Sequence, residues 1–202
     1  MSGAPVHFVP TLTPEDAARA DFYALLARLF YAPPDGKLLE SIAAAGDLDA
    51  AQGDLARAWR DLKSAAGVAA EQVLKEEYDT AFVGTGKAPV TLYACAYSLR
   101  YTNEAPLARL RGELSALGVA RRESASEPED HIALLCEVMR FLIAEKRAGL
   151  QDQKQFFERW IWPNAEPLCA AIKSSGATAF YKSVAALLSG LCTLEHAAFE
   201  LL

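Results

Sequence analysis

The stretch Ser126-Glu127-Pro128-Glu129-Asp130-His131 decides the fold, because it opens the longest apolar-periodic segment of the chain. A serine three residues before a glutamate forms a capping box, and a proline in a first turn lacks the N–H that would be left unpaired there. We therefore predict that a helix begins here and continues to about Ala148. Apolar side chains at helical spacing cover two sides of it, so it should lie in the centre of the core. The narrow strip left for water consists of Glu129, Ala133, Glu137 and Arg140.

Asp130 and His131 are predicted in the first turn of this helix. Acidic side chains in a first turn complement the helix dipole, which accounts for Glu127, Glu129 and Asp130 without any binding site. A cationic histidine gains nothing at that position, so His131 beside Asp130 indicates a hydrogen-bonding or ligand-binding role. On this chemistry a structural Asp–His contact and a binding role both stay open.

The rest of the chain is also predicted to be helical, which makes the fold all-α. Residues 83–91 should form a loop that contains Gly84 and Pro89, with Tyr93 and Tyr97 one helical turn apart after it. We expect a single globular helical bundle over residues 1–202. The connector at 119–125 could act as a hinge between subdomains 13–118 and 126–202. The expected helices span about 13–30, 38–45, 49–66, 69–82, 106–117, 151–162, 163–174 and 177–202.

Composition limits the class of partner. The 202 residues carry a net charge of −6, with a pI near 5.2, which argues against nucleic acid as a partner. Four widely spaced cysteines are predicted to be reduced core residues, and three unpaired histidines give no expectation of a metal site. The start MSGAPVHFVP has no basic or apolar leader pattern, and no window of 18 apolar residues occurs. We expect a cytoplasmic protein that is not inserted in a membrane.

Several motifs accompany Glu127-Pro128-Glu129-Asp130-His131 in a fixed order. They are EEYDTAFVG at Glu76 to Gly84, Pro89 with Tyr93 and Tyr97, Phe156-Phe157 with Pro163, and Phe180-Tyr181. With the I-x-x-L-x-x-x-M run after His131, these resemble the signature of the TorD/DmsD/NarJ family, cytoplasmic chaperones that mature molybdenum redox enzymes. Two departures leave the client enzyme open: Ala94-Cys95 replaces the usual Glu-Ser, and Trp160 stands near a common His position.

The resemblance implies a TorD-like bundle that is a chaperone and not an enzyme. Its implied partner is the precursor of a molybdopterin oxidoreductase catalytic subunit, bound through a twin-arginine signal peptide before cofactor insertion and export. No cofactor of its own is expected. The resemblance also leaves open weak guanine nucleotide binding, which is reported for the family, and direct contact with the molybdenum cofactor. The family contains monomers and domain-exchanged dimers, and the sequence permits either. The implied peptide-binding residues are Glu127, Pro128, Asp130, His131, Tyr78, Phe82, Gly84, Pro89, Tyr93 and Tyr97.

The chemistry of such a site is consistent with this partner. Asp130 would pair with a peptide arginine and His131 would orient the peptide, while the aromatic residues would line an apolar groove. Two alternatives stay open. One is a helical interaction module that does not bind signal peptides. The other is an enzyme with Asp130 and His131 as an acid–base pair, for which the sequence offers no recognisable nucleophile.

Overall fold

The computed structural model describes residues 12–48, 53–84, 87–98, 106–119 and 127–202. Every regular element in these ranges is helical, which confirms the all-α prediction, and the one strand-like contact is an isolated bridge between Tyr93 and His131. None of the described helices is long and apolar enough to cross a lipid bilayer. The α-helices are α1 (Pro14–Tyr31), α2 (Gly36–Ala44), α3 (Asp54–Val68), α4 (Glu71–Tyr78), α5 (Cys95–Ser98), α6 (Pro106–Ala116), α7 (Ile132–Ala144), α8 (Leu150–Phe156), α9 (Trp162–Ser174) and α10 (Phe180–Phe199).

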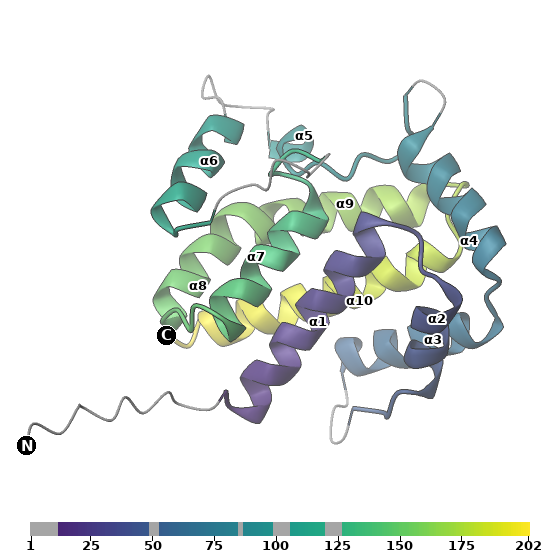
Figure 1. Ribbon diagram of the computed structural model, residues 1–202, viewed down its shortest axis with the longest axis horizontal. Helices are drawn as coiled ribbons and strands as arrows, with labels where there is room; N and C mark the ends of the chain where they lie inside the picture. Colours follow the sequence, from purple (N-terminus) through teal and green to yellow (C-terminus); the bar gives the residue numbers. More distant parts are fainter. Residues whose placement is uncertain (1–11, 49–52, 85–86, 99–105, 120–126) are drawn as a thin grey trace, which may run out of the picture.

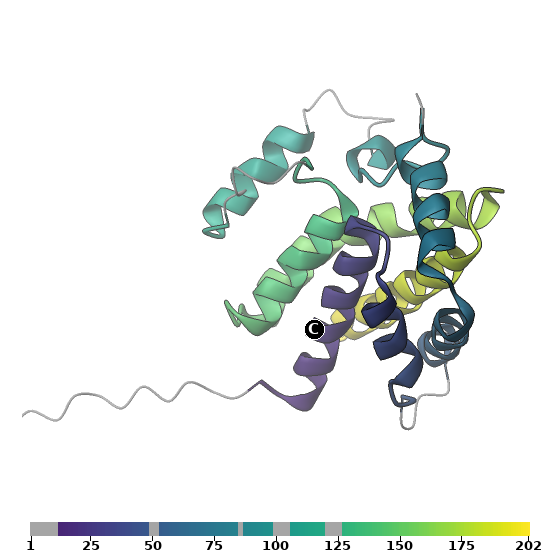
Figure 2. The same cartoon turned by 45° about the vertical axis from the view of Figure 1, so that its right-hand side comes forward.

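The centre of the molecule is formed by α1 and α7. They pack against each other over most of their length and lie side by side in Figures 1 and 2. The predicted first side of α7 is buried, whereas on the second side Val138 is buried and Leu134 and Phe141 are half-buried. Ala133 differs from the prediction, because it is only 1% exposed and its small side chain lies in the groove between α7 and α1. Ala133 is therefore not part of the strip that reaches water.

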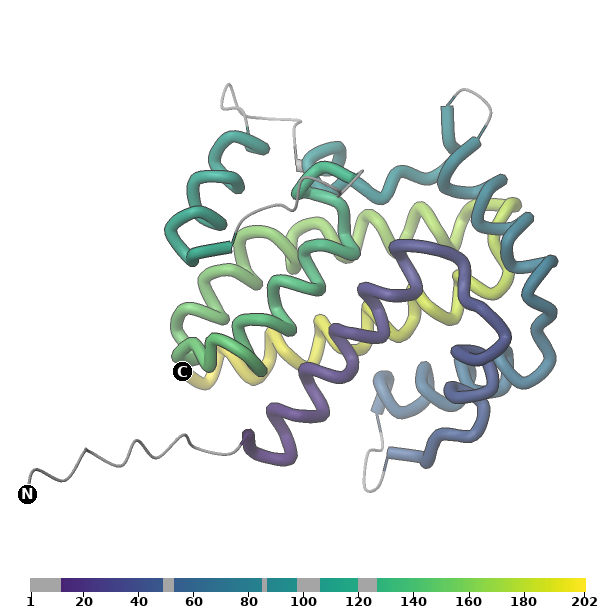
Figure 3. Tube along the Cα trace, in the orientation of Figure 1, coloured from purple at the N-terminus to yellow at the C-terminus, as the bar shows by residue number. Residues whose placement is uncertain are grey.

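The C-terminal helix α10 completes the core. α1 is the first helix of the chain and α10 the last, and the two contact each other (Figure 3). α10 also packs on α9 and on α3. At Gly190 an added Cβ would lie 2.9 Å from the Cα atom of Leu55, so a residue without a side chain is needed for this close approach of α10 and α3.

A buried ionic network ties α1 to α8 and α10. Arg19 Nε donates to Glu195 Oε1 at 2.6 Å, and Arg19 Nη2 donates to Gln153 Oε1 at 2.9 Å. The Tyr23 hydroxyl also donates to Glu195, at 3.3 Å. Because a buried carboxylate is costly unless it is paired, Glu195 requires these partners, and the network fixes the placement of the three helices.

Two helices that were predicted to be continuous pass into π-helical turns. α4 is followed by η1 (Asp79–Val83), and α8 is followed by η2 (Phe157–Ile161). A π-helical turn adds a residue to the helical repeat, so it changes the direction in which the following side chains point. The 3.6-residue pattern of the sequence could not show this, and η1 carries one wall of the site described below.

The start of α10 is capped by a residue from a distant helix. The carboxylate of Glu77 in α4 accepts the backbone N–H groups of Ala179, Phe180 and Tyr181 at 2.8, 3.1 and 2.9 Å. These groups would otherwise be unpaired at a helix N-terminus. α10 therefore begins at Phe180, three residues after the predicted start.

Other expectations have mixed outcomes. All four cysteines are free and buried, which confirms their assignment to the core. α7 ends at Ala144 and not near Ala148, and Arg147 follows with a φ of 50°. Of the expected hinge at 119–125, only Val119 lies within the described residues, and Ser126 of the predicted capping box lies outside them as well.

Candidate functional site

The turn Glu127–His131 is held by backbone pairing with the segment before α5. The Ala94 N–H donates to the Asp130 carbonyl and the Ile132 N–H donates to the Leu92 carbonyl, both at 2.9 Å. This pair of hydrogen bonds forms the antiparallel bridge between Tyr93 and His131. The two segments with the predicted site motifs, which are distant in sequence, are therefore joined directly through their backbones.

His131 caps α7, which corrects the predicted helix start at Ser126 to Pro128. α7 begins at Ile132, and Nδ1 of His131 accepts the Ala133 N–H at 3.2 Å. Burial lowers the pKa of His131, against the opposing effects of Glu127 and Asp130. A neutral imidazole can accept a hydrogen bond, so a histidine fits a helix N-terminus in a way that its cationic form does not.

Asp130 is buried just before the helix. Its Oδ2 accepts the Cys95 N–H at 3.2 Å, and it is only 5% exposed. The pKa of the Cys95 thiol is raised to about 12, first by burial and then by the Asp130 charge, so this cysteine is an unreactive thiol at neutral pH. Asp130 and His131 each bond to a backbone N–H, and no hydrogen bond joins their side chains within the described structure.

Tyr93 and Glu127 close one side of the site. The Tyr93 hydroxyl donates to Glu127 Oε2 at 2.6 Å, and its ring lies edge-on to the His131 ring at 5.4 Å between centroids. The hydrogen bond to Glu127, followed by desolvation, raises the pKa of Tyr93 to about 12. Tyr93 remains 37% exposed, so this pair lies at the solvent edge.

The opposite wall comes from α4 and η1. Tyr78 and Phe82 are in edge-to-face contact at 5.2 Å, and both rings pack on Tyr181 of α10. The Tyr78 hydroxyl donates to the carbonyls of Phe30 and Tyr31 at 3.0 and 3.1 Å, at the C-terminal end of α1. Burial and then the charge of Glu127 raise the pKa of Tyr78 to about 12. This wall is thus anchored to two core helices.

The loop between the two walls is fixed at both ends. Gly84 has a φ of 61°, and an added Cβ would lie 3.0 Å from the Ala88 Cα atom, so glycine is required by both backbone conformation and space. The Val90 N–H donates to the Ala81 carbonyl at 3.0 Å, and Val90 and Leu92 are buried. Lys87 and Ala88 before Val90, and Thr91 and Tyr93 after it, line the cavity described next.

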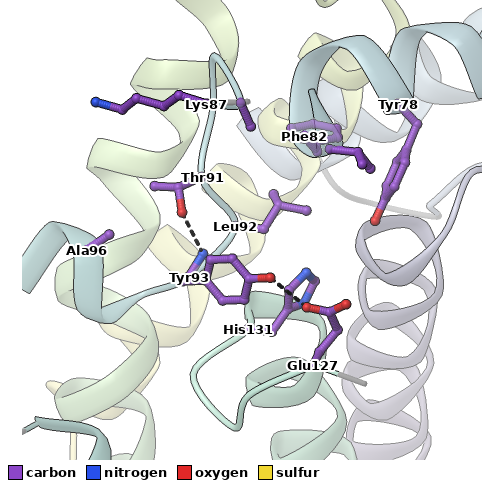
Figure 4. A pocket seen from close by; sticks show the side chains of 11 residues that line it. Tyr78, Phe82, Lys87, Thr91, Leu92, Tyr93, Ala96, Glu127 and His131 are labelled. Atoms are coloured by element: carbon purple, nitrogen blue, oxygen red, sulfur yellow. Dashed lines mark hydrogen bonds between the residues drawn. The ribbon is translucent and has the colours of Figure 1, made fainter. Parts of the chain in front are cut away.

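These elements enclose a pocket of about 710 Å³ that opens to solvent. In Figure 4 the Tyr93–Glu127 hydrogen bond lies at its lower edge, and the amino end of Lys87 points away from Glu127. The pocket therefore combines the Glu127 carboxylate at one edge and the Lys87 ammonium away from it with mostly apolar walls, so a cationic side chain beside an apolar one fits the Glu127 edge (Figure 4). Its lining residues are Tyr78, Phe82, Val83, Lys87, Ala88, Thr91, Leu92, Tyr93, Ala96, Glu127 and His131.

Five of the ten residues predicted for the site line this pocket, namely Glu127, His131, Tyr78, Phe82 and Tyr93. The other five do not line it. Three of them support neighbouring residues: Asp130 holds Cys95, Gly84 forms the turn, and the Tyr97 hydroxyl donates to the Thr91 carbonyl at 2.8 Å. Pro89 is exposed, and Pro128 accepts the His131 N–H with its carbonyl.

Sequence reasoning missed six of the lining residues. Val83, Lys87, Ala88, Thr91, Leu92 and Ala96 all lie between or beside the residues that the motifs identified. The one signal available was position: Val83, Lys87, Ala88 and Thr91 lie within the predicted loop at 83–91, and Leu92 and Ala96 lie beside Tyr93 and Tyr97. The residues that face the cavity are set by the π-helical turn η1 and by the burial of Val90. The local sequence pattern predicts neither the turn nor this burial.

Comparison with known families gives a match over more than half of the chain. The family model described as nitrate reductase delta subunit matches residues 48–170, a span that contains both walls of the pocket and α7. The chain therefore belongs to this family, part of the TorD/DmsD/NarJ group of redox enzyme maturation proteins. Proteins of this family are chaperones for the maturation of molybdoenzymes and are not themselves the catalysts. No curated protein matches the chain.

Proposed function

We propose that this chaperone binds the N-terminal twin-arginine signal of a molybdopterin oxidoreductase precursor in the cytoplasm, through the pocket between η1 and the Glu127–His131 turn. The observation that carries this proposal is the placement of the Glu127 carboxylate at the edge of an aromatic and aliphatic pocket. A twin-arginine signal presents guanidinium groups followed by apolar residues. The guanidinium groups match the Glu127 carboxylate, and the apolar residues match the aromatic and aliphatic walls. In this proposal the bound precursor is held until its cofactor is inserted.

Glu127, and not Asp130, is the carboxylate suited to an arginine. Asp130 is buried and bonded to a backbone N–H, whereas Glu127 lines the pocket and accepts from an exposed tyrosine. An arginine can bond a carboxylate through two parallel N–H groups, which is stronger than a bond from a neutral hydroxyl. The peptide arginine would therefore compete with the Tyr93 hydroxyl for Glu127.

The apolar wall would hold the residues that follow the arginines. Phe82 and Tyr78 present ring surfaces that are fixed by Tyr181, so little side-chain entropy is lost on binding. A volume of about 710 Å³ is in the range of small-ligand sites, so it can accept a few side chains and not a whole apolar helix. The remainder of the signal would lie along the outer surface.

The same geometry gives no support to an acid–base enzyme. Nδ1 of His131 is engaged as a helix cap, and the Asp130 carboxylate accepts from Cys95. Neither group is arranged to activate the other. A general interaction module would bind peptides with or without arginine. The proposed chaperone requires the arginine pair, and this difference can be measured.

The test is a calorimetric titration with a synthetic peptide that carries an arginine pair and an apolar stretch. We expect saturable binding without turnover. Glu127→Gln should weaken binding by about 1 to 3 kcal/mol, as expected for a lost charged hydrogen bond, and Glu76→Gln, an equal charge change at an exposed site, should not. If the protein binds a peptide with alanine in place of both arginines equally well, it is a nonspecific interaction module and the proposal is wrong.

A further inference from the structure

A second group of polar side chains lies at the far end of α10, outside the pocket. Glu158 of η2, His196 of α10 and Glu200 directly after α10 each offer one ligand atom, and these atoms lie within 4.8 Å of one another. The Glu200 N–H donates to the His196 carbonyl at 3.0 Å, so the helical backbone continues through this turn. Residues four apart on a helix share a face, which directs His196 and Glu200 toward the same neighbour.

The imidazole of His196 is fixed in orientation but incompletely paired. Its ring stacks on the indole of Trp162, with centroids 4.1 Å apart and planes within 12°. Among the residues that the structure describes, its Nδ1 is the one buried side-chain nitrogen or oxygen atom without a hydrogen-bond partner. A buried polar atom without a partner is unfavourable, so its retention calls for an explanation such as a bound ion.

The surroundings favour a cation. Two carboxylates lie at the C-terminal end of α10, where the helix dipole is negative. The Lys154 ammonium donates to the Phe199 carbonyl at 2.7 Å, which shows that a positive charge is already stabilised at this helix end. Lys154 Nζ also forms an ion pair with Glu158 Oε1 at 3.7 Å, a separation longer than a hydrogen bond, so the carboxylate retains oxygen lone pairs for an ion.

We propose that Glu158, His196 and Glu200 bind a divalent transition-metal ion such as Zn²⁺. One imidazole and two carboxylates are ligands that Zn²⁺ accepts, and three protein ligands leave a position for water. Glu158 is 38% exposed and has a flexible side chain, so it can close the remaining distance to an ion. The aromatic ring of Trp162 would hold His196 in place, as outer-shell contacts do in metal sites.

This site departs from the expectation drawn from the sequence, which considered only pairs of histidines. His196 and Glu200 do have the i, i+4 spacing of helical metal ligands, but Glu158 is 38 residues from His196 and reaches them only through the packing of η2 on α10. The bound ion would join η2 to the end of α10. Neither the pocket nor the proposed client takes part in this inference.

The test uses full-length protein freed of metal by a chelator and then titrated with Zn²⁺ against a chromophoric competitor. We expect one site per chain, with binding weakened about tenfold or more in Glu158→Gln, His196→Gln and Glu200→Gln. Glu166→Gln and His7→Gln remove an exposed carboxylate and another histidine, and they should bind Zn²⁺ like the wild type.

Two further readouts do not depend on affinity alone. Zn²⁺ should raise the melting temperature of the wild type and not that of Glu200→Gln, because an ion that binds only the folded chain stabilises it. Co²⁺ should quench the fluorescence of Trp162 because of its stacking on His196, and Trp162→Phe should remove the quenched component. An absence of saturable binding, or equal losses in the cluster variants and the two controls, would overturn the proposal.

Discussion

Replacement of Glu77 by alanine tests how the site wall is joined to the core. Glu77 precedes Tyr78 of the pocket, and its carboxylate accepts three backbone N–H groups at the start of α10, at 2.8 to 3.1 Å. Glu77→Ala leaves these donors at a half-buried helix end without a protein partner. The variant should therefore destabilise the fold without touching the lining of the pocket.

The expected loss is about 2 kcal/mol. Removal of an N-cap side chain costs roughly 0.5–2 kcal/mol, and a hydrogen bond to a charged group is worth roughly 1.5–3 kcal/mol. Water can reach Ala179 and partly replace the carboxylate, so the three bonds do not add in full. For a domain of this size each kcal/mol lowers the melting temperature by about 2–4 °C, which gives a shift of roughly 4–8 °C.

The assay is urea unfolding followed by circular dichroism, alongside a thermal melt. The matched control is Glu76→Ala, which makes the same substitution one position earlier on the exposed face of α4. We expect Glu76→Ala to stay within about 0.5 kcal/mol of the wild type. If both variants unfold at the same urea concentration, the Glu77 cap contributes nothing and the reasoning is refuted.

Three further predictions concern pH, competition and backbone packing. Burial lowers the pKa of His131 below its usual 6.5, so the stability that its neutral ring provides is complete above about pH 6.5 and declines as the pH falls. His131→Asn keeps a capping acceptor but does not titrate, so the melting temperature should depend less on pH between pH 5 and 7. Equal pH dependence in the variant and the wild type would contradict this prediction. Tyr93→Phe removes the competing hydroxyl and should tighten binding of the arginine peptide by about 1 kcal/mol in calorimetry, and weaker binding would show that Tyr93 contacts the peptide favourably. Gly190→Ala should lower the free energy of unfolding by about 1–3 kcal/mol, measured with urea, since its Cβ would meet the Leu55 backbone at 2.9 Å. Gly112→Ala in α6, with open space around it, should be neutral or stabilising. If Gly190→Ala is as stable as the wild type, α3 and α10 can move apart.

The helical architecture could be predicted because it depends on periodic apolar residues. The two-sided apolar pattern of Ile132 to Ile143 identified α7 as a central helix, and its burial bears this out. The order of the motifs along the chain was enough to group Tyr78, Tyr93 and Glu127 as site residues, and all three line one pocket. Local pattern and family resemblance were sufficient to predict the helical core and to group these three residues, and their role in binding stays a prediction.

Contacts between distant segments could not be predicted in the same way. His131 serves as a helix cap because burial keeps its imidazole neutral, and that burial depends on the bridge to Tyr93. Asp130 turns toward Cys95 for the same reason, since the backbone of that segment is paired with its own. The π-helical turn η1 leaves no trace in a 3.6-residue pattern, although it determines how Phe82 faces the cavity.

Site-specific photo-crosslinking tests the central claim, the location of the client segment, most directly. A photoreactive phenylalanine analogue at Ala96, an exposed lining residue of the pocket, should crosslink to the arginine-pair peptide, and excess unlabelled peptide should suppress the product. The same analogue at Val68, which is 87% exposed at the end of α3 and outside the lining, should give no specific product. Specific crosslinking at Val68 with none at Ala96 would place the client elsewhere on the protein and contradict the account.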